Sequence, residues 1–162
     1  MAVRVYGRAR NHLRGRGGPW LGSPMHFEAS IQIGAPAGQV FDTWTDVERW
    51  PSWTSSVTRV EPVDRGPLKA GFRARVRQPR LPVALWQVTE LVPGESFTWE
   101  ARGRGLVTTA SHRVAPVAGG VRATATLDQA GPLGLLVGLV YRRLTRRYLR
   151  TELTGLKDYC ES

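Results

Sequence analysis

Cysteine, metal-binding motifs and long apolar runs are scarce in this chain of 162 residues. Cys160 is the single cysteine, so it can form no internal disulfide, and a reducing cytoplasm suits it best. No uncharged stretch is longer than that of residues 129–141, which contains Pro132 and falls short of the ~20 apolar residues that a membrane span needs. The N-terminus lacks the continuous apolar segment of a signal peptide, because arginines interrupt it. We therefore expect a cytoplasmic protein without a membrane span.

Motifs for cofactors and metals are also missing. The chain has no HExxH pair, no P-loop and no complete dinucleotide fingerprint. The glycine-rich pieces at residues 15–18 and 103–105 are too short, and they lack the strand-to-helix context of a nucleotide site. We expect neither a metal site nor a cofactor.

The positive charge is concentrated at the N-terminus. The net charge is +10, and residues 1–24 hold five of the 23 basic residues and no acid. The other 18 basic and 13 acidic residues leave +5 on residues 25–162. Residues 1–24 are rich in glycine and arginine, which predicts a disordered extension that is dispensable to the domain. Whether this segment belongs to the native protein stays open.

Residues 40–57 gather large aromatic side chains. Trp44, Trp50 and Trp53 lie within ten positions, and each such ring buries roughly 150–250 Å². Pro51 disfavours helical geometry at Trp50, so we expect one short helix to end there and a second turn to follow. Indole rings beside such a break predict the rim of a cavity.

Alternating apolar and polar residues predict a series of strands. In residues 71–77, for example, Phe72 and Val76 share one face and three arginines the other, which predicts a buried and a solvated face. The same alternation marks residues 27–33, 57–63, 83–92, 97–102, 106–117 and 121–128. Residues after Gly131-Pro132 carry apolar side chains at helical spacing, which predicts one long helix.

This order of elements predicts an α+β domain over residues 25–162. The first strand and the later run of hairpins would form a curved antiparallel sheet of about six to seven strands in all, and two short helices would follow the first strand. The sheet must bury its apolar face, and the long C-terminal helix is the only large partner for it. A sheet that grips this helix leaves a cavity between the two.

Six stretches of the chain match one known pattern: IQIGAPAGQVF (31–41), TDVERWPSW (45–53), WQVTEL (86–91), PG (93–94), FTW (97–99) and GPLG (131–134). Together with the order of elements, they resemble the START-like, or Bet v 1-like (SRPBCC), superfamily and its helix-grip fold. Within it, the chain is similar to bacterial polyketide cyclase/dehydrase-type proteins. The resemblance covers about residues 26–160 and implies a hydrophobic ligand cavity, as in the aromatase/cyclases, lipid carriers and hormone receptors of the superfamily.

His112 is the best candidate for a catalytic residue, although the catalytic set stays unknown. It is in phase with Ala110 and Val114, so it should point toward the concave face, as either a general acid–base or a hydrogen-bonded core histidine. We find no carboxylate that pairs with it, and Glu90 is the best one available. We expect the cavity to be lined by Trp44, Trp53, Trp86, Phe97, Trp99, His112, Val137 and Tyr141, with ordinary core packing as the alternative.

Three functions remain open. The first is binding of a hydrophobic small molecule such as a lipid, a polyketide or an aromatic metabolite. The second is a cofactor-independent polyketide cyclase or dehydratase in which His112 transfers protons. The third is a non-enzymatic protein that binds nucleic acid or anionic membrane through its basic surface. We expect these last partners less than the small ligand, through residues 1–24 if at all, and a monomer or a homodimer.

Overall fold

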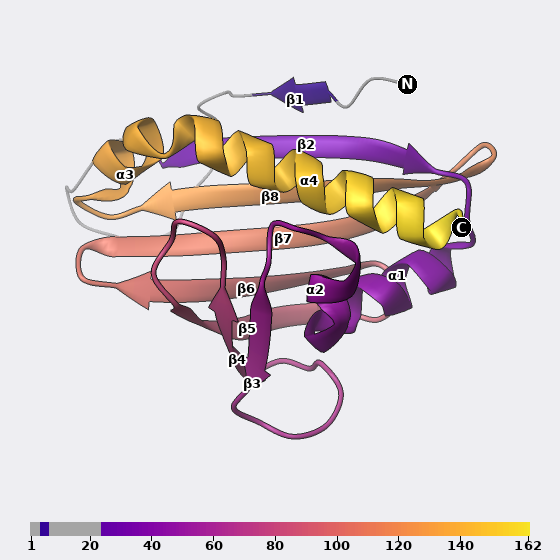
Figure 1. The fold of residues 1–162 in the computed structure, drawn as a ribbon, viewed down its shortest axis with the longest axis horizontal. Helices are drawn as coiled ribbons and strands as arrows, with labels where there is room; N and C mark the ends of the chain where they lie inside the picture. The colour runs from indigo at the N-terminus through magenta and orange to yellow at the C-terminus, as the bar shows by residue number, and fades with distance from the viewer. Residues whose placement is uncertain (1–3, 7–23) are drawn as a thin grey trace.

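The computed structural model describes residues 4–6 and 24–162, which form one antiparallel sheet with helices packed on one face (Figure 1). The strand order is β1-β2-β8-β7-β6-β5-β4-β3. The strands are β1 (Arg4–Tyr6), β2 (Met25–Ile33), β3 (Arg59–Pro62), β4 (Arg73–Arg77), β5 (Ala84–Val92), β6 (Ser96–Gly103), β7 (Leu106–Val117) and β8 (Gly120–Ala130). The helices are α1 (Ala37–Thr45), a 3₁₀ turn η1 (Val47–Arg49), α2 (Trp50–Trp53), α3 (Gly134–Val140) and α4 (Arg142–Cys160).

The predicted α+β helix-grip architecture is confirmed. Tight hairpins join β5 through β8, and β8 returns to pair with β2. The 19-residue helix α4 lies across β2 and β8 and contacts α1 and α2 near its C-terminal end (Figure 1). Gly155 allows this approach, because a Cβ there would collide with the carbonyl oxygen of Trp53.

Alternation places the core between the sheet and α4. Phe72, Ala74 and Val76 are buried, whereas Arg73, Arg75 and Arg77 are exposed, as the alternation predicts. On α4, Leu149, Leu153 and Leu156 form the buried stripe that meets the sheet. No helix in the described part of the chain combines the length and the hydropathy of a membrane span.

The predicted single C-terminal helix is wrong in one respect, because the chain breaks at Tyr141 into α3 and α4. The glycines of α3 let it pack closely on β8 and β2, whereas α4 packs through leucines. The axes of the two helices therefore point in different directions (Figure 1).

The prediction for Pro51 is also wrong. Trp50 has helical geometry (φ −50°, ψ −42°), and Pro51 lies in the first turn of α2, where a missing N–H leaves no bond unmade. Helix α1 instead ends at Thr45.

The expected disorder of residues 1–24 concerns mostly residues outside the described part of the chain. Residues 1–3 and 7–23 are not described, whereas residues 4–6 form β1, antiparallel to β2.

Candidate functional site

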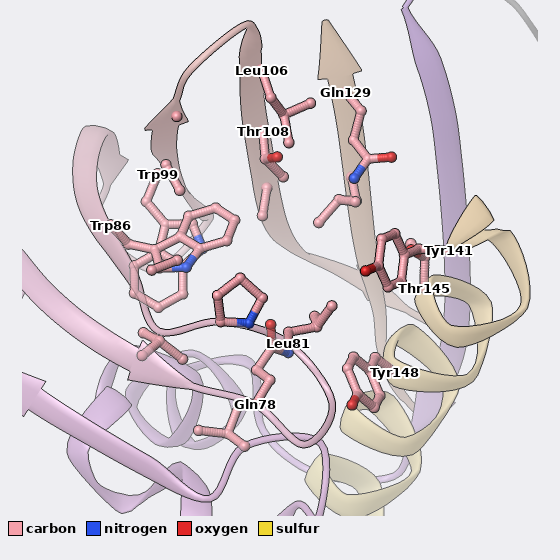
Figure 2. A pocket seen from close by; sticks show the side chains of 18 of the residues that line it. Gln78, Leu81, Trp86, Trp99, Leu106, Thr108, Gln129, Tyr141, Thr145 and Tyr148 are labelled. Carbon is pink, nitrogen blue, oxygen red and sulfur yellow. The ribbon is translucent and has the colours of Figure 1, made fainter. Parts of the chain in front are cut away.

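A pocket of about 470 Å³ lies between the sheet and the C-terminal helices. Figure 2 shows Trp86 and Trp99 on the sheet side and Tyr141 and Tyr148 on the helix side. The segment between β4 and β5 covers the pocket with Leu81. The wall is mainly apolar, and its polar members include Gln78, Thr108, His112, Gln129, Thr145 and Glu152.

His112 lines the pocket from β7, as its phase with Ala110 and Val114 predicts. Its ring is 4% exposed and stacks on Phe97, with centroids 4.3 Å apart and planes inclined by 10°. The rings of Trp44 and Trp50 meet it edge-on at 5.0 and 5.6 Å. These aromatic contacts fix the plane of the imidazole.

The sequence-based expectation that no carboxylate pairs with His112 is wrong. Glu152 of α4 is 7% exposed, and its Oε1 lies 3.2 Å from His112 Nε2. The same oxygen accepts a 2.8 Å hydrogen bond from Trp44 Nε1. Trp50 Nε1 in turn donates to the Trp44 carbonyl oxygen at 2.9 Å. The tryptophan-rich segment thus positions the carboxylate that faces the histidine.

The burial of Glu152 could have been predicted from helical spacing, although not from the alternation within strands. It lies on the same helical stripe as Leu149, Leu153 and Leu156, and a carboxylate among core leucines is rarely buried without a partner. Spacing along the helix identifies its buried face. Only the docking of α4 against the sheet identifies His112 as the residue opposite.

Two polar atoms near the pocket have no hydrogen-bond partner among the described residues. These are His112 Nδ1 and Gln129 Oε1, both buried. Buried polar atoms are usually satisfied, so a ligand or water would give these two a partner, but only after a small movement of the side chains that cover them. Gln129 was not predicted, although its phase with Leu127 on β8 could have indicated it.

The structure divides the eight predicted cavity residues. Trp86, Trp99, His112, Val137 and Tyr141 line the pocket. The other three lie outside its wall: Trp44 is buried behind His112 with its N–H on Glu152, and Phe97 is covered by the imidazole. Trp53 is turned toward Trp50, with ring centroids 5.9 Å apart, and it is Trp50 that lines the pocket.

Glu90 is not a partner for His112. The register of the β5–β6 pair shifts between Val88 and Glu90, and this irregularity turns the Glu90 side chain to solvent. Strict alternation from Trp86 and Val88 would have directed it inward.

Tyr148 closes the pocket from α4. Its hydroxyl donates a hydrogen bond to the carbonyl oxygen of Pro79, in the segment that carries Leu81. Burial raises the pKa of Tyr148 above its usual value of 10.0, so the hydroxyl keeps its proton and its donor role at neutral pH. Arg80, beside it, has a left-handed backbone (φ 63°) at the tip of this segment.

Residues 24–161 match the model of the family described as polyketide cyclase / dehydrase and lipid transport. The chain belongs to this family. The resemblance read from the sequence is thereby confirmed. A search of curated protein sequences found no match.

Solved structures share the fold of this family member at low sequence identity. The Zhui aromatase/cyclase from Streptomyces sp. R1128 is 14% identical with a TM-score of 0.70, over 85% of this chain and 94% of that one. A protein from Thermus thermophilus is 19% identical with a TM-score of 0.68, over 82% and 94%. Ara h 8.0201 is 12% identical with a TM-score of 0.66, over 85% and 98%. At these identities the likeness concerns the fold.

Proposed function

We propose that the protein binds a hydrophobic small molecule, such as a lipid, a polyketide or an aromatic metabolite, in the pocket between the sheet and α4. The observation that carries this proposal is the pocket itself, about 470 Å³ in volume and walled by Trp50, Trp86 and Trp99. Sites for small molecules typically measure about 300–1,000 Å³ and combine apolar walls with a few polar groups. Burial of apolar ligand surface contributes ~25 cal/mol per Å².

The polar atoms in the wall would orient the ligand. His112 Nδ1 and Gln129 Oε1 are buried without a partner within the described residues, so a ligand with donor groups would gain bonds there once the covering side chains move. The family description, which names both cyclases and lipid transport, is consistent with such a ligand. The cytoplasmic location stays a prediction from the lone Cys160.

Native mass spectrometry of the freshly purified protein tests for a retained ligand. A titration with the fluorescent probe 1-anilinonaphthalene-8-sulfonate then tests the pocket. Thr108→Phe fills the pocket and should weaken probe binding at least about tenfold. The matched control is Thr109→Phe, because Thr109 is the next residue of β7 and contacts Glu100 on the opposite face. Probe binding that survives Thr108→Phe unchanged would contradict the proposal.

A second candidate function is cyclisation or dehydration of a poly-β-ketone, favoured by the contact between His112 and Glu152. In the tautomer that points Nε2–H at the carboxylate, Nδ1 is a free acceptor. Because Nδ1 is buried, a bound substrate must first displace the side chains that cover it; this nitrogen would then take a proton from the carbon between two carbonyl groups and return it to a departing hydroxyl. The rest of the catalysis would come from folding the chain in the pocket, hence from proximity and orientation.

A synthetic poly-β-ketone thioester analogue tests this second candidate, with loss of water followed by mass spectrometry. His112→Asn should abolish turnover while probe binding persists. His26→Asn is the matched control, because His26 pairs with Asp128 at 2.7 Å and does not line the pocket. Equal turnover by the wild type and His112→Asn would exclude a role for this histidine.

A further inference from the structure

Helix α3 has its faces reversed relative to an ordinary surface helix. Its buried residues are Gly134 and Gly138. A Cβ at position 134 would lie 2.8 Å from the Gln129 carbonyl oxygen, and one at position 138 would lie 2.6 Å from the Met25 side chain. The glycines therefore let the helix backbone rest directly on β8 and β2.

The large side chains of α3 consequently face away from the core. Leu135, Leu136, Leu139 and Val140 are 53%, 59%, 53% and 67% exposed. Leu133 and Tyr141 at the two ends are also exposed. Surface helices normally turn such residues toward the core, and contiguous exposed apolar groups mark interaction sites. We call Leu133, Leu135, Leu136, Leu139, Val140 and Tyr141 the α3 patch.

Arginines flank the α3 patch on both sides. Arg142 and Arg143 follow it directly and are exposed, as are Arg147 and Arg150 further along α4. On the other side, the exposed Arg104 lies in the turn whose Gly105 carbonyl accepts a hydrogen bond from Leu133. None of these five arginines forms an ion pair with another described residue.

We propose that the α3 patch and these arginines dock the protein on the surface of an anionic lipid bilayer. Exposed leucines next to arginines are typical of elements that lie in the membrane interface. Each arginine near an anionic surface adds electrostatic attraction that falls off within a Debye length. A membrane contact through residues 1–24 stays a prediction, because most of that segment lies outside the described residues, whereas α3 lies within them.

Two other occupants fit this surface less well. Nucleic acid would use the arginines and leave the exposed leucines in water. A second copy of the chain, related by a two-fold axis through α3, would bring two sets of unpaired arginines together. A bilayer accepts the leucines in its acyl boundary and the arginines at its headgroups.

Docking in this orientation would place the α3 end of the pocket next to the lipid. Val137 and Tyr141 line the pocket from α3 and its C-terminal end, and Leu136 and Val140 beside them belong to the α3 patch. An apolar ligand would then reach the pocket without crossing bulk water. This consequence rests on the proposed binding function, whereas docking itself does not.

Flotation of the full chain with vesicles tests the proposal. Phosphatidylcholine vesicles are compared with vesicles that also contain phosphatidylglycerol. Binding should require phosphatidylglycerol and should weaken with salt. Leu135→Asp/Leu139→Asp should weaken it at least about tenfold, since both leucines leave the acyl boundary. The matched control Val63→Asp/Val92→Asp also replaces two exposed aliphatic residues and should change binding by less than about twofold.

The charge contribution has its own pair of variants. Arg142→Glu/Arg143→Glu should weaken binding more than about tenfold, and acids are tolerated there because α4 begins at Arg142. Arg75→Glu/Arg122→Glu, with the same change of net charge on other exposed positions, should retain most of the binding. If both charge variants weaken binding equally, net charge rather than this surface is responsible, and the proposal fails.

A labelling experiment detects directly whether the α3 patch contacts the vesicle. Cys160 is 5% exposed, so an environment-sensitive thiol dye should react selectively with the variant Leu136→Cys. Its emission should shift to the blue on phosphatidylglycerol vesicles, and the dye on Val92→Cys should not respond. Three results would overturn the proposal: no vesicle binding, binding that Leu135→Asp/Leu139→Asp leaves intact, or a dimer that this double variant dissociates in the absence of vesicle binding.

Discussion

Replacing Glu152 with alanine tests the polar contact that joins α4 to the sheet and to α1. Glu152 Oε1 accepts the 2.8 Å bond from Trp44 Nε1 and lies 3.2 Å from His112 Nε2. All three side chains are buried. The substitution leaves the indole N–H without an acceptor and the imidazole without its carboxylate.

The expected loss of stability follows from these contacts. Each buried donor left without an acceptor costs ~1–3 kcal/mol of the free energy of unfolding, and two donors lose their acceptor here, which makes ~2–6 kcal/mol. At ~2–4 °C per kcal/mol for a chain of this size, Glu152→Ala should lower Tm by ~4–24 °C. Glu152→Gln keeps an oxygen for Trp44 and loses only the charge, so its cost should be ~1–2 kcal/mol.

Urea unfolding followed by tryptophan fluorescence measures these differences. Asp158→Ala, an exposed carboxylate on the same helix, should stay within about 0.5 kcal/mol of the wild type. A double-mutant cycle with Trp44→Phe should give a coupling of ~1.5–3 kcal/mol, because the bond joins an N–H to a charged acceptor. The reasoning is refuted if Glu152→Ala costs no more than Asp158→Ala, or if the two effects in the cycle simply add.

Two further predictions concern the edges of the pocket and of α4. Tyr148→Phe removes the bond to Pro79, so the anilinonaphthalene probe should leave the pocket faster in stopped-flow experiments, and an unchanged rate would show that this bond does not hold the covering segment. Glu161 accepts a 2.6 Å hydrogen bond from the Gly34 N–H and a second one from Lys157 Nζ. The Gly34 bond is the largest of the causes that lower the pKa of the Glu161 carboxyl below 4.5. Its stabilisation is therefore present above pH 4.5 and is lost as the pH falls through the folded-state pKa. Glu161→Gln should lower Tm at neutral pH and make Tm less sensitive to acid below that value, and an equal Tm difference at every pH would contradict this.

The sheet was predictable because the alternation of apolar and polar residues within each strand indicates which face of that strand is buried. The arginines at positions 73, 75 and 77 face solvent and their apolar neighbours face the core, in keeping with a period of two. The same alternation correctly predicted that His112 points toward the pocket. The position of Glu90 was wrong because a local shift in register reverses the faces without a clear mark in the sequence.

The contacts between distant segments were not predictable in this way. Helical periodicity places Glu152 among leucines, but its distance from His112 depends on how α4 docks against a strand far from it in the chain. Helix α3 departs from the usual pattern in another way, because its leucines do not form its buried face. Gly134 and Gly138 take the buried positions, since only they allow the backbone to touch the sheet.

The segment over the pocket has a consequence for how ligand range could be changed. Residues 78–83 lie outside the strand ladders, yet Gln78, Leu81, Pro82 and Val83 supply part of the pocket wall. Lengthening or shortening this segment would alter the depth of the pocket and leave the register of β4 and β5 intact. A designer could therefore retarget the protein by exchanging one short loop, with the Tyr148 hydroxyl as its anchoring point.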